Sequence, residues 1–149
     1  MKAMKIYLDN CAIQRPLDDK SQIRIALESE AVLGIISLFE LKTIELLSSD
    51  ILVFEVTKTP NIIRREYIID LLEKSSIHIS VNSDIEDRAN EFEQYGIKAI
   101  DALHLASAEI GNADYFCTCD DKFLKKIPRI KDLKIKVSSP IELIQEIEQ

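Results

Sequence analysis

Short apolar runs, each followed by a longer segment with helical spacing, are the feature that most constrains the fold of this chain. Five runs of four or five residues are rich in Ile, Leu, Val, Tyr and Phe, and they have the length of buried strands rather than of helices. This alternation predicts a three-layer α/β sandwich, in which helices flank a mainly parallel central sheet. The predicted strands are residues 4–8, 44–47, 77–81, 115–118 and 134–137.

The segments between these runs carry the signals of helices. In 61–74, Ile62, Ile63, Tyr67, Ile68, Leu71 and Leu72 form one apolar stripe, which we expect to be buried. Ser83-x-x-Glu86 is the pattern of a capping box and predicts that a helix begins there. Residues 99–110 are apolar almost all round, so this helix should lie in the interior. Further helices are predicted at 21–41, 50–57, 83–95 and 120–127, and from Ser139-Pro140 onward.

Length and composition indicate one soluble globular domain over residues 1–149, with only 3 Gly and 4 Pro to form long loops. No apolar run approaches the 18 or so residues that a membrane span needs. Asp9 interrupts the first apolar run too early for a signal peptide, so we expect a cytoplasmic protein. Cys11, Cys117 and Cys119 are an odd number and a poor disulfide framework, and small buried side chains are favoured over a Cys-x-Cys metal site.

Charge is unevenly distributed along the chain. The formal net charge of −7 argues against general coating of nucleic acid, which depends on basic surface. Residues 120–136, however, hold seven basic side chains against three acidic ones, among them Lys122, Lys125 and Lys126. A solvated surface and a local nucleic-acid contact both fit this segment.

Carboxylates recur where the predicted strands and helices meet. Asp9 follows the first strand, Asp120 and Asp121 follow the strand 115–118, and Asp101 opens the buried helix. In open parallel sheets, function gathers beyond the carboxyl ends of the strands. Glu55 lies in the apolar segment "ILVFEV", where burial of a carboxylate is costly unless it is paired or bound to a metal.

Each of these carboxylates also has a purely structural interpretation. Asp9, Asp101 and Asp120 or Asp121 are all suited to capping a helix or ending a strand. Their joint occurrence has one common explanation, because clustered carboxylates repel one another unless a cation neutralises them. Oxygen ligands suit Mg²⁺ or Mn²⁺, which bind phosphate oxygens and activate water. Glu40 is a weaker rival to Glu55, since it precedes the second strand instead of following it.

The chain resembles the PIN-domain nucleases, especially the VapC-type toxins of bacteria and archaea, over about residues 5–146. The resemblance is carried by "IYLDN", "SSDILVFEV", "KAIDALHLASAEIGNADYFCTCDDKF" and "VSSPIELI", in that order. It implies an acidic quartet of Asp9, Glu55, Asp101 and Asp120 that holds Mg²⁺ or Mn²⁺. It also implies endonucleolytic hydrolysis of RNA by metal-activated water, a homodimer and a protein antitoxin.

The resemblance suggests roles for further residues and shows one departure. Thr118 would orient the site through its hydroxyl, and Asp121 would assist or merely cap a helix. The family usually has a small hydroxyl residue and then asparagine after the first aspartate, whereas this chain has Asn10 and Cys11. If the strand continues, Asn10 points away from Asp9, and the orientation of Asp9 is then in question. Arg15 is suited either to a phosphate contact or to a surface ion pair with Asp18 or Asp19.

Other interpretations stay open or fail on single residues. A PIN-like scaffold that is catalytically silent and binds protein or RNA is the main alternative, and the Asn10-Cys11 departure supports it. A haloacid-dehalogenase-like phosphatase needs an aspartate where Cys11 stands, and a receiver domain needs its acidic pair after the first strand. His104, three residues after Asp101, is interpreted as a core histidine rather than as a general base.

Overall fold

The fold was analysed in a computed structural model that describes residues 3–148. Five strands form one sheet in the order β3-β2-β1-β4-β5, and every neighbouring pair is parallel. The predicted sandwich is therefore confirmed, with a sheet that is entirely parallel. The strands are β1 (Met4–Leu8), β2 (Ile44–Ser49), β3 (Ile77–Ile79), β4 (Tyr115–Cys117) and β5 (Lys136–Ser138).

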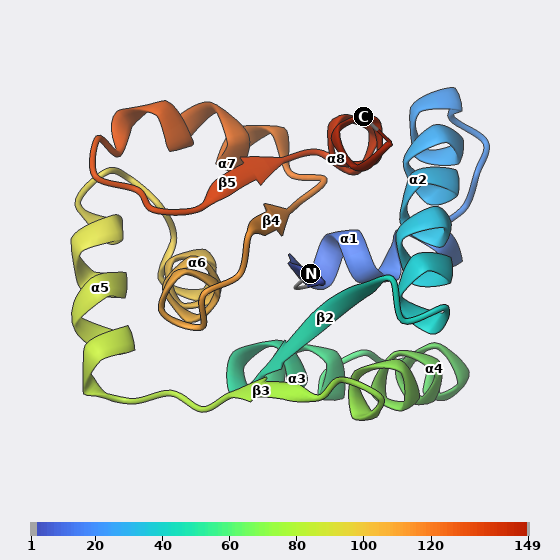
Figure 1. Cartoon of the computed structure of the whole chain (residues 1–149), viewed down its shortest axis with the longest axis horizontal. Helices are drawn as coiled ribbons and strands as arrows, with labels where there is room; N and C mark the ends of the chain where they lie inside the picture. The colour runs from blue at the N-terminus through green and yellow to red at the C-terminus, as the bar shows by residue number, and fades with distance from the viewer. Residues whose placement is uncertain (1–2, 149) are drawn as a thin grey trace.

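Helices cover both faces of this sheet (Figure 1), with α5 and α6 packed together on one side and α2 against α8 on the other. The helices are α1 (Asn10–Gln14), α2 (Ile23–Glu40), α3 (Asp50–Thr57), α4 (Ile62–Glu73), α5 (Ser83–Glu93), α6 (Ala99–Ile110), α7 (Asp121–Lys126) and α8 (Pro140–Ile147), with short 3-10 turns η1 (Arg15–Leu17) and η2 (Ile127–Arg129). Within residues 3–148, no helix is long and apolar enough to cross a membrane.

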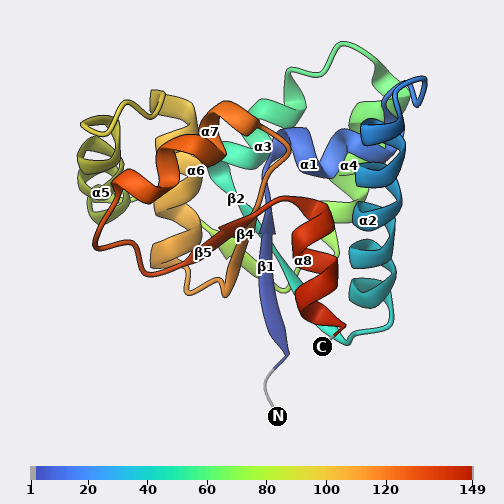
Figure 2. The same cartoon turned by 90° about the horizontal axis from the view of Figure 1, so that it is seen from above.

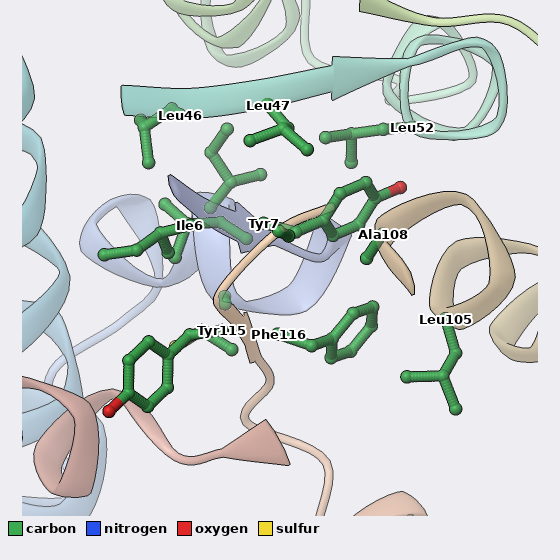
Figure 3. Close-up of a cluster of buried hydrophobic side chains, with 14 of the residues drawn as sticks. Ile6, Tyr7, Leu46, Leu47, Leu52, Leu105, Ala108, Tyr115 and Phe116 are labelled. Carbon is green, nitrogen blue, oxygen red and sulfur yellow. The ribbon is translucent and has the colours of Figure 1, made fainter. Parts of the chain in front are cut away.

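The core lies on both sides of the central strand β1. Tyr7 and Phe116 are fully buried on adjacent strands and their rings stack with centroids 5.3 Å apart (Figure 3). Leu105 of α6 and Leu47 of β2 pack against the same cluster. Cys117 and Cys119 are buried free thiols, as expected for small core side chains.

The strand order places a change of direction beside β1. The chain moves outward from β1 to β2 and β3, and then returns to place β4 on the other side of β1. Crevices in open parallel sheets form at such a switch point, beyond the carboxyl ends of the two strands. Figure 2 shows α1, α3 and α7 gathered at that end of the sheet, away from the N-terminus.

The predicted end of the first strand at Leu8 is confirmed, because the Asp9 side chain accepts a hydrogen bond from the Ala12 amide and caps α1. Two other sequence predictions of local structure are wrong in detail. Asn82, not Ser83, caps α5. Asp101 is not an N-cap, since α6 begins at Ala99 and Lys98 holds the cap position.

The apolar stripe predicted for 61–74 is buried only in part. Ile68, Leu71 and Leu72 are buried, whereas Ile62 and Ile63 are 63% and 83% exposed and Tyr67 is 41% exposed. The apolar side chains at the beginning of α4 therefore form part of the protein surface.

Candidate active site

A pocket of about 340 Å³ lies beyond the carboxyl ends of β1 and β4, at the switch point of the sheet. Four carboxylates from four separate segments line it: Asp9, Glu55, Asp101 and Asp120. We call this hollow the acidic pocket; it is also lined by Asn10, Cys11, Arg15, His104 and Cys119. The structure thus brings all four predicted carboxylates together, whereas Glu40 lies exposed at the far end of α2 and is not part of the pocket.

Asp9 both caps a helix and faces the pocket. Its Oδ1 accepts from the Ala12 amide at 3.0 Å and from the Cys11 thiol at 3.1 Å. The side chain is 5% exposed, and this burial raises its pKa well above the usual range, whereas a hydrogen bond from Thr118 lowers it. Capping and a site role are therefore compatible at this residue.

Asp120, at the end of β4, likewise caps a helix and lines the acidic pocket. It is the N-cap of α7, and its Oδ1 accepts from the amides of Lys122 and Phe123 at 2.9 and 3.3 Å. Thr118 Oγ1 accepts from the Asp120 amide at 3.1 Å and lies 3.4 Å from Cys11 Sγ. Thr118 therefore contacts both strand-end segments, as its predicted orienting role requires.

Cys11, one of the two residues that depart from the family pattern, makes a direct contact with Asp9. Its thiol donates to Asp9, and the Cys119 amide donates to its sulfur at 3.4 Å. Contact with the Cys119 side chain and burial raise the pKa of Cys11, so the group stays a thiol and remains a donor. A thiol thus donates to Asp9 from the position where the family usually has asparagine, and Asp9 Oδ1 is held by this thiol and by the Ala12 amide.

Asp101 approaches from the first turn of α6, which leaves its carboxylate half-buried at the pocket. Burial raises its pKa, and the nearby carboxylates Asp120 and Glu55 raise it further, whereas His104 and Lys98 lower it. Burial is the main cause of the raised pKa at both Asp9 and Asp101, and neighbouring carboxylates add to it at Asp101.

Glu55 is held by a buried hydrogen-bonded chain that sequence reasoning missed. Its Oε1 lies 2.5 Å from His104 Nε2, His104 Nδ1 lies 2.6 Å from the Tyr7 hydroxyl, and that hydroxyl lies 2.7 Å from Ser49 Oγ. In the neutral form of His104, the ring donates from Nε2 to the carboxylate and accepts at Nδ1, so Tyr7 donates to His104 and Ser49 donates to Tyr7. The Leu52 amide completes the chain by donating to Ser49.

The sequence singles out Glu55, His104 and Ser49 separately but not their connection. His104 is interpreted as a core residue, and Ser49 or Asp50 as the cap of the helix predicted over 50–57. Both assignments are confirmed, since Ser49 caps α3 and His104 is 1% exposed with both ring nitrogens bonded. Tyr7 carried no sequence signal beyond its place in an apolar strand, because its partners come from β2 and α6.

The remaining predicted site residues lie at or outside the rim. Arg15 lines the acidic pocket but pairs with Asp18 at 3.0 Å and with the buried Glu28 at 3.3 Å. Asp121 faces away and forms a bidentate pair with Arg24, which lowers the pKa of Asp121. None of the basic residues predicted to contact nucleic acid from α7 lines the acidic pocket: Lys122, Lys125 and Lys126.

The donor set of the pocket fits a hard divalent cation. It offers carboxylate oxygens, two of them on acids whose pKa is raised by burial, and its one cationic side chain is already paired with two acids. Across residues 3–148, however, no group of three or more His, Cys, Asp or Glu side chains is already arranged to hold a metal ion. The carboxylates share a pocket without converging on one ligand position.

A sequence model of the PIN domain matches residues 6–129. The chain belongs to the PIN-domain family. A search of curated proteins found no match to the chain.

Solved structures with the same fold come from bacterial toxin–antitoxin systems. VapBC2 of Rickettsia felis, bound to a DNA fragment from its promoter, superposes with a TM-score of 0.57 at 19% identity, over 90% of this chain and 98% of that one. VapC20 of Mycobacterium tuberculosis, described as a toxin that cleaves the sarcin-ricin loop, gives 0.56 at 15% identity, over 80% and 93%. VapBC-1 of nontypeable Haemophilus influenzae gives 0.55 at 19% identity, over 92% and 98%.

Proposed function

We propose that this PIN-domain protein is a Mg²⁺- or Mn²⁺-dependent endoribonuclease and the toxin half of a toxin–antitoxin pair. The observation that carries the proposal is the acidic pocket, where Asp9, Glu55, Asp101 and Asp120 meet from four separate segments. Structural neighbours that include an RNA-cleaving toxin and complete toxin–antitoxin complexes support it. RNA is the proposed substrate, and the cytoplasm is the proposed place of action.

Different residues of the pocket would bind the cation and orient its ligands. Asp9, Asp101 and Asp120 would hold the cation, and Glu55, positioned by His104, would complete the ligand set. A bound Mg²⁺ supplies neutralisation of the phosphate charge and a lowered pKa of water. Thr118 and Cys11 keep the strand-end carboxylates oriented, and the buried walls around Tyr7 and Leu8 keep their dielectric low.

The protein partners follow from the family and its neighbours. Two of the structural relatives named above are toxin–antitoxin complexes, so we propose that a protein antitoxin covers this pocket. From the family resemblance we also propose that the chain forms a homodimer. An inhibitor that inserts a basic side chain would satisfy the carboxylates in place of the cation.

A catalytically silent scaffold remains the second candidate. One observation favours it: within the described chain, no set of side chains is prearranged around a metal position. In that case the pocket would be a binding surface for protein or RNA.

Titration with Mn²⁺ by calorimetry separates the two candidates. The nuclease proposal expects binding in the micromolar range that Asp101→Asn abolishes, and cleavage of single-stranded RNA by the parent protein in Mn²⁺. Asp121→Asn is the matched control, because it removes a neighbouring carboxylate that faces Arg24 instead of the pocket. Absence of Mn²⁺ binding by the parent protein would leave the scaffold function.

A further inference from the structure

A second hollow, of about 640 Å³, adjoins the acidic pocket at the same end of the sheet. The two share Asn10 and Glu55 as a common wall. We call the second hollow the side groove; apart from the shared wall, it is lined chiefly by Gln14 of α1, Arg64 of α4, and Lys58, Thr59 and Asn61 from the segment that joins α3 to α4.

The floor of the side groove is held by Gln14, whose side chain is 8% exposed and has three partners. Its Nε2 donates to Asn10 Oδ1 at 2.7 Å and to Thr59 Oγ1 at 3.2 Å, and its Oε1 accepts from Arg64 Nη1 at 3.1 Å. Arg64 also pairs with Asp18 at 2.7 Å. One buried amide therefore links α1, α4 and the segment between α3 and α4, so the groove has a shape fixed before any ligand arrives.

The same contacts determine which way the two amides face. Arg64 can only donate, so its partner on Gln14 must be the carbonyl oxygen, and Nε2 of Gln14 must then face Asn10. The oxygen of Asn10 is thereby turned toward Gln14. Its NH₂ group has no protein partner within the described chain and lies at the wall between the groove and the acidic pocket.

The two hollows differ in charge. The acidic pocket has four carboxylates and one cation that is already paired, whereas the side groove adds Lys58, adds Arg64, which is paired with Asp18, and has no acid beyond the shared Glu55. Lys58 makes no ion pair in the described chain and lies over the ring of Phe54, 4.1 Å from its centroid. If an RNA strand places one phosphate over the carboxylates, its next nucleotide lies in the side groove. There it can contact the Lys58 ammonium group and the Asn10 NH₂ group.

We infer that the side groove binds the nucleotide next to the scissile phosphate of a single-stranded RNA. Lys58 contacts the phosphate of that nucleotide, and the Asn10 NH₂ donates to one of its oxygen atoms. An unpaired strand is required, because only a strand whose bases are unstacked presents single nucleotides to such a groove. This inference rests on the proposed ribonuclease function and extends it to the path of the substrate.

The test is equilibrium binding of a fluorescein-labelled single-stranded RNA of about 12 nucleotides, followed by anisotropy at several salt concentrations. Ca²⁺ is used as the cation, since it seeks the same oxygen ligands, and a gel confirms that the RNA stays intact. Lys58→Gln should lower affinity about fivefold at 0.1 M salt and reduce the salt slope by about 0.7, the effect of one lost phosphate contact on a single strand.

Two further variants sharpen the result. Lys42→Gln removes the same charge from an exposed turn between α2 and β2, at the opposite end of the sheet, and should leave both affinity and slope unchanged. Asn10→Asp keeps the oxygen that Gln14 bonds but replaces the NH₂ donor with an acceptor. It should weaken RNA binding while Mn²⁺ affinity, measured by calorimetry, is retained or increased.

The outcomes separate this inference from the function it rests on. If the parent protein binds RNA and Lys58→Gln binds it with equal affinity and slope, the groove is not an RNA subsite and a peptide is the occupant left. If the parent protein neither binds nor cleaves RNA, the ribonuclease function fails and the groove assignment fails with it.

Discussion

Cys11 shows how one side chain can depart from a family pattern and keep its purpose. A thiol is a weaker donor than the amide of the asparagine usual at this position, but here it sits 3.1 Å from Asp9 and also contacts Thr118 and the Cys119 amide. The departure therefore does not by itself argue for an inactive protein. What matters is that a donor, of either kind, orients the carboxylate.

Replacement of this residue tests that interpretation. Cys11→Ser keeps a donor and should retain Mn²⁺ affinity, whereas Cys11→Ala removes it and should weaken Mn²⁺ binding by about tenfold, the usual effect of losing a partner of a metal ligand. Calorimetry on the two variants measures the difference. Equal affinities for serine and alanine would show that Asp9 is oriented without this contact.

Asp101 links the site to stability. Because its folded-state pKa is raised, the folded protein holds a proton that the unfolded chain has already released. Without a cation, stability should therefore fall as pH rises from the ordinary aspartate pKa, about 4, through the raised value. Asp101→Asn should remove part of this fall and stabilise the metal-free protein at pH 7 by about 1 kcal/mol.

Urea unfolding of the parent protein and of Asp101→Asn, from pH 4 to pH 8 in EDTA, checks this prediction. Asp121→Asn serves as the control with the opposite sign, because Arg24 lowers the pKa of Asp121 and its carboxylate stabilises the fold above that value. A metal-free parent that becomes steadily more stable over this range would contradict the clustered-carboxylate interpretation.

At the scale of elements, one hydrogen-bonded chain joins four of them. Ser49 lies at the end of β2, Tyr7 in β1, His104 in α6 and Glu55 in α3. Burial raises the pKa of Tyr7, so the phenol keeps its proton and stays a donor to His104. The packing of a helix against the sheet thus determines where a pocket carboxylate points.

Tyr7→Phe breaks this chain without removing the ring. It should destabilise the fold by about 1–2 kcal/mol, since a buried acceptor on His104 loses its partner, and weaken Mn²⁺ binding by about tenfold. Tyr115→Phe is the matched control, because it removes a hydroxyl that bonds Glu146 on the other side of the sheet. It should change stability alone. Equal Mn²⁺ affinities for both variants would show that His104 does not position Glu55.

At the scale of the whole molecule, the site exists only in the folded chain. Its four carboxylates stand at positions 9, 55, 101 and 120 and come to line one pocket only when the strand order is complete. A cation that binds the folded state alone adds about 2.7 kcal/mol at a concentration of one hundred times its Kd. For a chain of this size that should raise Tm by roughly 5–10 °C.

Thermal unfolding in Mn²⁺ and in EDTA measures this linkage. Asp120→Asn should lose most of the increase, whereas Lys42→Gln should retain it, because the latter lies at the opposite end of the sheet. An equal rise in Tm for all three proteins would indicate that Mn²⁺ binds elsewhere on this acidic surface.

The sequence alone determined the class of fold, the boundaries of most helices and the identity of the pocket carboxylates. The period of apolar residues and the capping preferences of Asp9, Ser49 and Ser139 are local properties, and local properties can be read along a chain. The order of elements along the chain ranked Glu55 above Glu40, because Glu55 follows the second strand and Glu40 precedes it.

Only the tertiary structure decided which side chains meet. Four features join residues that are distant in sequence. They are the Tyr7–His104 hydrogen bond, the contact of the Cys11 thiol with Thr118, the Asp121–Arg24 ion pair and the side groove beside Asn10. The exposure of Ile62 and Ile63 likewise depends on how α4 packs against the rest of the fold. The periodicity of apolar residues along the sequence indicates which face of its own helix or strand a side chain occupies. Packing between helices and strands decides which residues that face contacts.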